Sequence, residues 1–197
     1  MPVIAVDVVL LPEETMMDYA ITANAGLVKR FGGEIVLNKK DCLPHISLTM
    51  GCVNQDDVTK IGESLKPLAA IAPRRLKPAG IQRTTSFSGE IVSVLQVERS
   101  NQLQNLHEKI CDAVKPFFTY DVTKEMIARG QAGTSTLQWI KNYPVKSSYS
   151  NFYPHITIGY GDLPDRELPA DFAVSRLAMC HLGNHCTCTK ILWSVNI

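Results

Sequence analysis

The sequence lacks the long apolar runs and the excess of one charge that mark membrane proteins and proteins that coat nucleic acids. None of its apolar stretches approaches the ~20 residues that a membrane-spanning helix needs. Its 20 Lys and Arg residues nearly balance its 19 Asp and Glu residues, which gives a net charge of +1. Because binding to long nucleic acids relies on many phosphate contacts, this balance argues against a broad basic surface and leaves a small or terminal anionic ligand as the alternative.

An export signal and a regular cysteine framework are also missing. The first apolar stretch, VIAVDVVLL at 3–11, is interrupted by Asp7, has no basic leader and runs into Pro-Glu-Glu, so it indicates a strand rather than a signal peptide. Without such a signal, the cysteines are most simply interpreted as reduced thiols; they stand at positions 42, 52, 111, 180, 186 and 188. We therefore expect a cytoplasmic monomer that does not associate with membranes.

Hydrophobic periodicity predicts both strands and helices along the chain. Strands are predicted at 3–11, 34–37, 43–51, 75–85, 90–98, 153–161, 172–182 and 187–196, with turns at 86–90 and 182–185. Helices are predicted from Pro12 to Gly32, from about Asn54 with a kink at Pro67, and from a Ser100 cap to Phe117. The pattern weakens from 119 to 150, apart from a helical piece around STLQWIKNY, and indicates an insertion containing loop.

The order of these elements predicts the fold class. Strands and helices do not alternate strictly, which favours an α+β fold with a mainly antiparallel sheet. At 197 residues the chain suits one sizeable domain or two small lobes, and no linker-like segment divides it. We expect a single domain over residues 1–197, with the insertion near 119–150.

One phrase of the sequence occurs twice. LPHISLTMG at 43–51 and YPHITIGYG at 153–161 share a Pro-His-Ile-hydroxyl-aliphatic core. In a strand, residues two apart share a face, so His45 lies beside Ser47 and the later motif repeats the arrangement. A single strand histidine is usually structural, with its ring nitrogens bonded to the backbone, whereas two matched imidazole and hydroxyl pairs indicate a site facing a cleft.

The two phrases resemble the signature of the 2H phosphoesterase superfamily, which includes 2′-5′ RNA ligase-like proteins and cyclic nucleotide phosphodiesterases. The resemblance implies two pseudo-symmetric lobes of mainly antiparallel sheet, with helices packed outside and a central cleft between them. It carries over onto His45, Ser47, His155 and Thr157 as catalytic residues. A third His-x-Thr at 185–187 lacks the preceding proline and the aliphatic frame, and is left out.

The implied activity is that of a phosphoesterase acting on 2′,3′-cyclic phosphate ends of RNA or nucleotides, or of 2′-5′ ligation in reverse. Two histidines on opposite sides of a phosphate act as general base and general acid, with their ring nitrogens roughly 5 to 8 Å apart. Which histidine is the acid stays open. The two hydroxyls hold the non-bridging oxygens or orient the imidazoles. Since no carboxylate accompanies either motif, we expect no metal and no cofactor.

Residues around the second motif are candidates for binding the rest of the substrate. Tyr149, Phe152 and Tyr153 offer a wall for a base or ribose, and Lys146 and Lys141 offer charge to a phosphate. The alternative is that the aromatic residues belong to the core and the lysines to a solvated loop.

Two other classes of function stay open. One is a binding module that holds a nucleotide or an RNA end without turning it over. The other is a metal-binding protein, because thiol and imidazole residues gather at Cys180, His181, His185, Cys186 and Cys188, although their spacing matches no common zinc motif. Among substrates, RNA ends are preferred over small cyclic nucleotides, ADP-ribose cyclic phosphate and 2′-5′-linked oligonucleotides.

Overall fold

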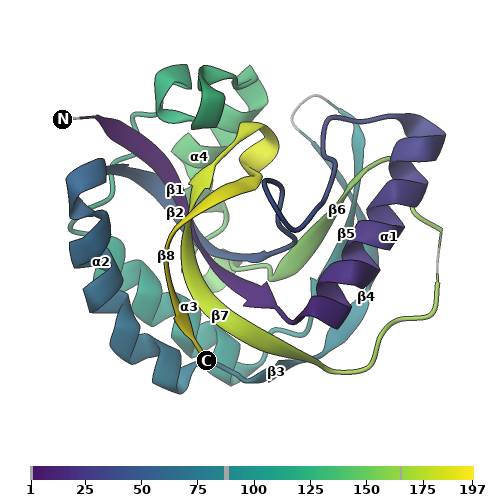
Figure 1. Ribbon diagram of the computed structural model, residues 1–197, viewed down its shortest axis with the longest axis horizontal. Helices are drawn as coiled ribbons and strands as arrows, with labels where there is room; N and C mark the ends of the chain where they lie inside the picture. Colours follow the sequence, from purple (N-terminus) through teal and green to yellow (C-terminus); the bar gives the residue numbers. More distant parts are fainter. Residues whose placement is uncertain (1, 87–88, 165) are drawn as a thin grey trace.

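The strands of the chain make one antiparallel sheet, which confirms the α+β class. The computed structural model describes residues 2–86, 89–164 and 166–197, so the middle of the turn expected at 86–90 lies outside the described residues. Neighbouring strands in this sheet follow the order β3-β7-β1-β2-β6-β5-β4, and β8 pairs with β7 (Figure 1). The strands are β1 (Val3–Pro12), β2 (Ile46–Asn54), β3 (Arg75–Leu76), β4 (Pro78–Thr85), β5 (Ile91–Val97), β6 (His155–Tyr160), β7 (Phe172–Leu182) and β8 (Cys188–Asn196).

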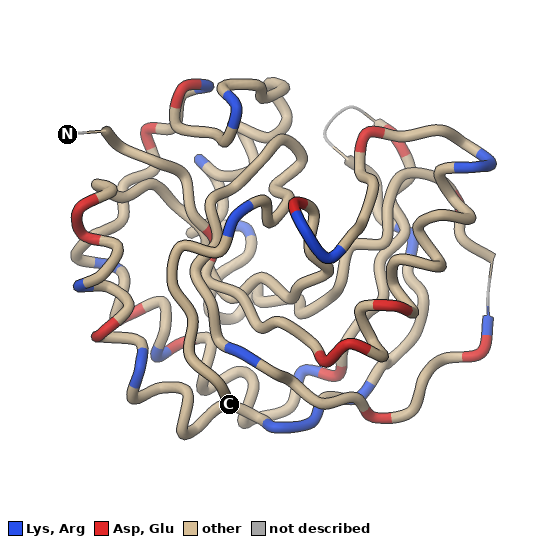
Figure 2. The backbone as a smooth tube through the Cα atoms, viewed as in Figure 1, with Lys and Arg blue, Asp and Glu red and all other residues tan. Residues whose placement is uncertain are grey.

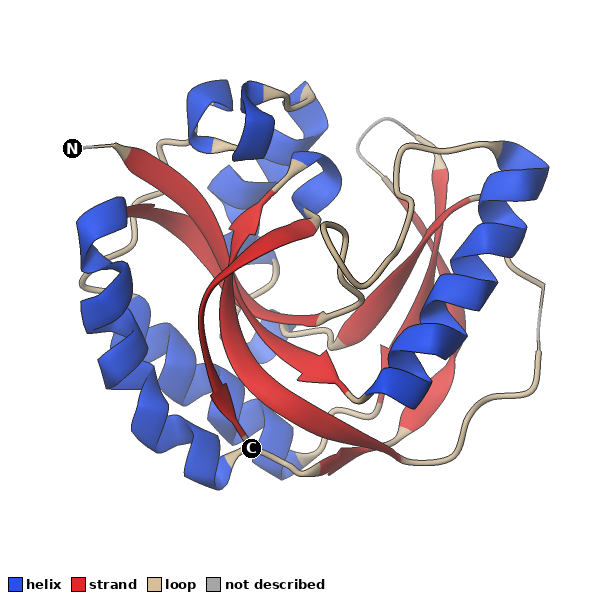
Figure 3. Cartoon of the chain, viewed as in Figure 1, coloured by secondary structure: helices blue, strands red, loops and turns tan. Residues whose placement is uncertain are grey.

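Helices cover the sheet from several sides (Figure 3). They are α1 (Glu14–Phe31), α2 (Val58–Leu65), α3 (Asn101–Val114) and α4 (Thr134–Lys146). Helix α1 packs on β6, α2 and α3 pack on each other and on β8 and β2, and α4 lies against β2. In the described part of the chain, no helix is long and apolar enough to cross a membrane. Acidic and basic residues are interspersed over these elements (Figure 2).

Prolines and a capping serine set several helix and strand ends. Ser100 caps α3 as predicted, since its hydroxyl accepts a hydrogen bond from the Leu103 amide at 3.2 Å. Pro12 ends β1 instead of starting the first helix, which begins at Glu14. The second helix continues as 3₁₀ turns over Lys66–Ile71, around the kink expected at Pro67. The strand predicted at 75–85 is two strands, β3 and β4.

The strand predicted at 34–37 is wrong, because this segment is an irregular extended loop. A side chain takes the place of a neighbouring strand. Asn24 on α1 donates through Nδ2 to the carbonyls of Ile35, at 2.9 Å, and Ile158, at 2.7 Å, and its Oδ1 accepts from the Leu37 amide at 2.9 Å. Ile35 and Leu37 still bury their side chains, so the apolar pattern reports burial rather than sheet pairing.

The two motif strands meet at the centre of the sheet through one residue pair, Ile46 opposite Ile156. Each strand also carries a β-bulge against its other neighbour. The β1–β2 register skips Leu48, and the β5–β6 register skips Ile158. These two residues occupy the same position in the two phrases, three residues after the histidine, so the repeated sequence folds into a repeated backbone irregularity.

The interpretation of all six cysteines as reduced thiols is wrong for two of them. Cys180 on β7 and Cys188 on β8 form a disulfide, with their Cα atoms 5.5 Å apart. The hairpin of these strands brings the two thiols together across a short turn at 183–187, where the sequence pattern predicts a turn at 182–185. Because disulfides are uncommon in cytosolic proteins, this bond removes one of the two arguments for a cytoplasmic location.

Replacing Asn24 with Ala should destabilise the protein by about 2 to 4 kcal/mol, because it leaves buried backbone groups of three residues without a partner. Urea unfolding of the two proteins measures the difference. Asn142→Ala is the matched control, since the Asn142 amide donates to a single exposed carbonyl, that of Gln138. Equal losses in the two variants would contradict the role of Asn24.

Candidate active site

The four side chains predicted to be catalytic line one cavity of about 520 Å³. His45 and Ser47 come from the start of β2, and His155 and Thr157 from β6. The side chains of His45 and His155 are partly exposed to this cavity rather than packed in a dry core. The structure therefore brings together residues that are 110 positions apart in the sequence.

The pairing of Ile46 with Ile156 explains this convergence. Both isoleucines are fully buried and point into the main core. Side chains alternate across a strand, so the residues on either side of each isoleucine point to the opposite face of the sheet. The antiparallel direction of the pair then sets the histidine of each motif beside the hydroxyl residue of the other.

The backbone around each proline fixes the tautomer of the histidine that follows it. His45 Nδ1 donates to the carbonyl of Leu43 at 2.7 Å, and His155 Nδ1 donates to the carbonyl of Tyr153 at 2.8 Å. A carbonyl only accepts, so Nδ1 carries the proton in both rings and Nε2 is left to accept one. The intervening proline holds the preceding residue extended, which presents that carbonyl to the ring.

Burial keeps both rings neutral at neutral pH. Burial lowers the pKa of His45 from 6.5 to about 4, and the nearby His155 lowers it slightly further. The hydrogen bond to the Leu43 carbonyl raises it, but by less than burial lowers it. Burial lowers the pKa of His155 as well, and the hydrogen bond to the Tyr153 carbonyl raises it by a smaller amount. At neutral pH each Nε2 is therefore a base facing the cavity.

A buried carboxyl group that sequence reasoning missed lies beside the first motif, so the expectation that no carboxylate accompanies either motif is wrong. Asp7 on β1 is completely buried, and its Oδ2 is 2.6 Å from Ser47 Oγ and 3.7 Å from His45 Nε2. Burial raises the pKa of Asp7 well above the usual value, and the hydrogen bond with Ser47 lowers it by a smaller amount. An acidic residue in the middle of an apolar strand was the signal in the sequence.

The tentative substrate-binding residues divide into two groups. Lys146 and Tyr153 line the cavity. Phe152 is instead buried in the core, stacked on His107 with ring centroids 4.0 Å apart, and Tyr149 hydrogen bonds through its hydroxyl to Asp112 at 2.9 Å. Neither Phe152 nor Tyr149 lines the cavity, because the short 3₁₀ turn before β6 points both side chains toward α3.

The segment from 119 to 150 forms a wall of the cavity rather than a peripheral loop. Its helix α4 is longer than the piece predicted and contributes cavity-lining residues; they are Ser135, Thr136, Trp139, Tyr143 and Lys146. The packing of α4 on β2 brings this wall against the first motif strand.

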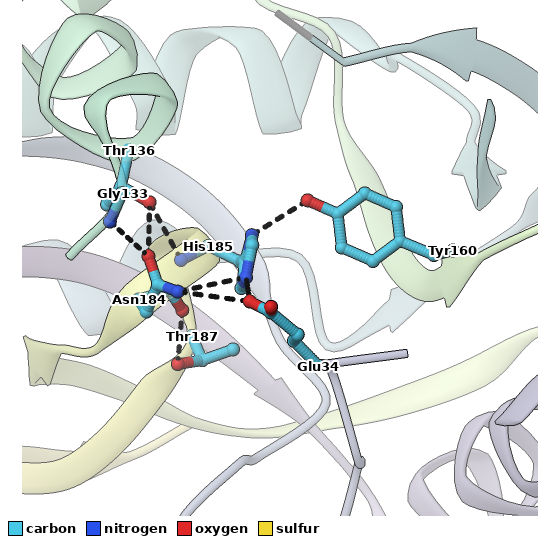
Figure 4. Close-up of polar contacts among 7 residues, drawn as sticks. All are labelled: Glu34, Gly133, Thr136, Tyr160, Asn184, His185 and Thr187. Carbon is cyan, nitrogen blue, oxygen red and sulfur yellow. Dashed lines mark hydrogen bonds and ion pairs between the residues drawn. The ribbon is translucent and has the colours of Figure 1, made fainter. Parts of the chain in front are cut away.

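His185, the histidine excluded from the motif, also lines the cavity and ties its rim together (Figure 4). Its Nε2 donates to the carboxylate of Glu34, and its Nδ1 accepts from the Tyr160 hydroxyl at 2.7 Å. Its backbone amide donates to Thr136 Oγ1 at 2.9 Å, which in turn donates to Asn184 Oδ1 at 2.8 Å. These contacts join the loop after α1, the end of β6, helix α4 and the β7–β8 turn.

The cluster of cysteine and histidine residues near the C-terminus does not converge on a metal site. Cys180 and Cys188 are bonded to each other, His181 Nε2 donates to the Met126 carbonyl at 3.1 Å, and both ring nitrogens of His185 have partners at the rim. Across residues 2–86, 89–164 and 166–197, no group of three or more His, Cys, Asp or Glu side chains is arranged to hold a metal ion.

His107 on α3 is a buried histidine that connects β2 with the turn that precedes β6. Its Nδ1 donates to the carbonyl of Leu48 on β2, and its Nε2 accepts from the amide of Tyr149, each at 2.7 Å. Tyr149 begins the turn that leads into β6. One buried imidazole thus fixes the spacing between the two halves of the site. Burial lowers the pKa of His107, and the hydrogen bond to the Leu48 carbonyl raises it by a smaller amount.

Comparison with known proteins agrees with this geometry. The sequence profile of the 2′-5′ RNA ligase superfamily matches residues 39–191, a range that includes both motifs. The chain belongs to the 2′-5′ RNA ligase superfamily. No curated protein matches it by sequence.

Several solved structures share the fold of this chain at low sequence identity. TT0787 of Thermus thermophilus is 15% identical with a TM-score of 0.61, over 98% of this chain and 97% of that one. LigT of E. coli in apo form is 13% identical with a TM-score of 0.55, over 100% and 98% of the chains. LigT complexed with phosphate is 12% identical with a TM-score of 0.53, over 100% and 99%.

Because the pKa of His107 is lowered, we expect the stability of the folded protein to depend on pH. The unfolded chain takes up a proton near pH 6.5 while the folded protein does not, so the contribution of His107 to stability is complete above pH 6.5 and is lost as pH falls below it. His45 and His155 act in the same direction. Each histidine contributes up to ~1.4 kcal/mol per pH unit, and Asp7, whose raised pKa acts in the opposite direction, offsets at most one of the three. Urea unfolding should therefore show stability falling from pH 7 to pH 5.

The variant His107→Ala should be less stable at pH 7, because it leaves the Leu48 carbonyl and the Tyr149 amide without partners, at a cost of about 2 kcal/mol or more. Its stability should also depend less on pH than that of the wild type. An unchanged pH slope in the variant would contradict the assignment of a neutral, buried His107.

Proposed function

We propose that this protein is a metal-independent phosphoesterase that opens 2′,3′-cyclic phosphates at RNA ends or on nucleotides. The observation that carries the proposal is the matched pair of histidines, with the same fixed tautomer, in one cavity. Membership in the 2′-5′ RNA ligase superfamily supports it, as does the fold shared with LigT, of which a phosphate complex is known.

His45 is the general base in this proposal and His155 the general acid. The pKa of His45 is held at about 4, so its Nε2 is neutral and accepts a proton from the attacking water. The water oxygen bonds to phosphorus, a ribose oxygen leaves, and His155, protonated once the anionic phosphate is bound, gives its proton to that oxygen. Thr157 and Ser47 donate hydrogen bonds to the non-bridging oxygens. In ligation a ribose hydroxyl replaces the water.

The two motif strands form the centre of two pseudo-symmetric lobes, with the cavity as the cleft between them. The bulges at Leu48 and Ile158 support this arrangement, since they stand at equivalent positions of the two phrases. RNA ends are the preferred substrate, and Tyr153 and Trp139 on the cavity wall are suited to stack against a base. Action as a monomer in the cytoplasm stays a prediction.

Replacing His45 or His155 with Ala should lower kcat for a 2′,3′-cyclic nucleotide about 10²- to 10⁴-fold, because each change removes a proton-transfer group. Thr157→Val should cost up to about 10²- to 10³-fold, through one lost donor to the phosphate. The double histidine variant should lose less than the product of the single losses, since the two residues act as one unit. Steady-state kinetics on purified variants tests all three statements.

The pH profile separates the two roles. The wild type should give a bell-shaped profile; His45→Ala should lose its acid limb and His155→Ala its basic limb. Arg129→Gln is a control outside the cavity, because this side chain pairs with Asp41 on the surface. Near wild-type rates in both single His→Ala variants, correctly folded and assayed on cyclic phosphates and 2′-5′ linkages, would falsify the proposal.

Turnover should persist in excess EDTA, because the cavity residues supply the acid, the base and the phosphate donors themselves. The assay is hydrolysis of a 2′,3′-cyclic nucleotide with and without chelator. Loss of activity that zinc or magnesium restores would favour a metalloenzyme. Tight binding of the same nucleotide without turnover would instead favour a binding module.

A further inference from the structure

Asp7 is the one acidic side chain whose carboxyl group touches the catalytic motif residues of the described chain. It is completely buried in the middle of β1, with Ser47 and His45 facing it from β2. From the other elements packed around it, Tyr143 on α4 and the Cys186 thiol lie near enough to interact with its charge. Its second oxygen, Oδ1, is buried without a hydrogen-bond partner in the described structure.

The number of protons shared by Asp7 and Ser47 decides what Ser47 can do. If Asp7 is ionised, the single Ser47 proton is donated to Oδ2 at 2.6 Å, and no proton is left for a phosphate. If Asp7 is protonated, its own O–H donates to Ser47 Oγ, and the Ser47 proton is free to point into the cavity. The same two oxygen positions therefore fit two states with opposite consequences for binding an anion.

The surroundings favour the protonated state. A fully buried carboxylate needs a paired cation or several donors, and Asp7 has one hydroxyl and a neutral imidazole at 3.7 Å. An unpartnered Oδ1 is less costly as the carbonyl of a neutral acid than as half of a carboxylate. Burial also raises the pKa of Asp7 well above its usual value.

We propose that Asp7 is a positioning residue held as a neutral carboxylic acid, which donates its proton to Ser47 so that Ser47 can donate to a substrate phosphate. This role rests on the proposed phosphoesterase function and adds a third member to the first motif. It also removes a negative charge from beneath an anion-binding site. Ionisation of Asp7 at high pH would reverse both effects.

The variant Asp7→Asn tests the proposal, because an amide keeps a donor for Ser47 Oγ and never ionises. We expect its kcat and KM for a 2′,3′-cyclic nucleotide to stay within about threefold of the wild type at neutral pH, since the hydrogen bond is retained. Ser47→Ala removes the hydroxyl itself and should weaken the binding of inorganic phosphate about tenfold, the effect of losing one hydrogen bond to a charged group, whereas Asp7→Asn should not weaken it. Isothermal titration calorimetry measures that binding.

Asp112→Asn is the matched control, because the Asp112 carboxylate bonds to the Tyr149 hydroxyl on the surface outside the cavity. It should change neither the kinetics nor phosphate binding. If Asp7 instead acts as an ionised partner of His45, Asp7→Asn should lose activity by several orders of magnitude, as in triads where a carboxylate orients the histidine, where the loss is about 10⁴-fold. That result would overturn the proposal.

Stability gives a readout that does not depend on turnover. The folded protein keeps the Asp7 proton while the unfolded chain releases it above about pH 3.8, so wild-type stability from this group is lost as pH rises through the folded pKa. Asp7→Asn avoids the loss. Its melting temperature should equal or exceed that of the wild type at pH 8, and the gap should close as pH falls toward 4.

Infrared difference spectroscopy between wild type and Asp7→Asn should show the C=O stretch of a protonated carboxyl group at pH 7. A carboxylate signal there, or a lower melting temperature for Asp7→Asn at pH 8, would overturn the proposal. A wild type that is inert toward all cyclic phosphates would overturn the proposed function alone, because the infrared and melting measurements still determine the protonation state of Asp7.

Discussion

The site depends on one antiparallel contact, the pairing of Ile46 with Ile156 between β2 and β6. Within the described chain these two strands share no other registered pair, and each is held to its outer neighbour by a longer ladder. Because both isoleucines point into the core, the flanking histidines and hydroxyl residues must point to the opposite face of the sheet. A shift of the register by one residue would move the histidines and hydroxyl residues of the two motifs into the core and aliphatic side chains into the cavity.

Around that contact the protein uses backbone groups, rather than charged partners, to orient its imidazoles. Each motif histidine donates to the carbonyl two residues before it, and His107 braces Leu48 and the turn before β6 through another neutral ring. Carbonyls fix the tautomer without stabilising the charged form as a carboxylate would. The rings therefore have a fixed orientation and tautomer while burial keeps their pKa values low.

Local pattern was enough to predict most of the strands and to place the two His-x-Ser/Thr motifs at the starts of two of them, because period-two alternation is encoded in neighbouring residues. The Ser100 cap is local in the same way. Contacts between distant residues were not predictable in the same way. Asn24 replaces a strand partner for a segment that follows it by eleven residues, and nothing near 34–37 signals that substitution. His185 lacks the motif frame, yet the left-handed backbone at the β7–β8 turn presents it to the same cavity. The Cys180–Cys188 disulfide likewise joins two residues that the β7–β8 ladder does not set opposite each other, and the cysteine spacing does not signal it.

The neutral state of the two motif histidines has a consequence for the proposed reaction. His45 and His155 both have pKa values below that of a free imidazole, so at neutral pH neither ring is the protonated acid that the proposed hydrolysis needs. A bound phosphate brings negative charge next to both rings and favours their protonated forms. In the proposed reaction the ring nearer the leaving oxygen takes up a proton, whereas the other stays neutral and available as a base. On that proposal the substrate itself generates the acid, and its orientation between the two rings sets the direction of proton transfer.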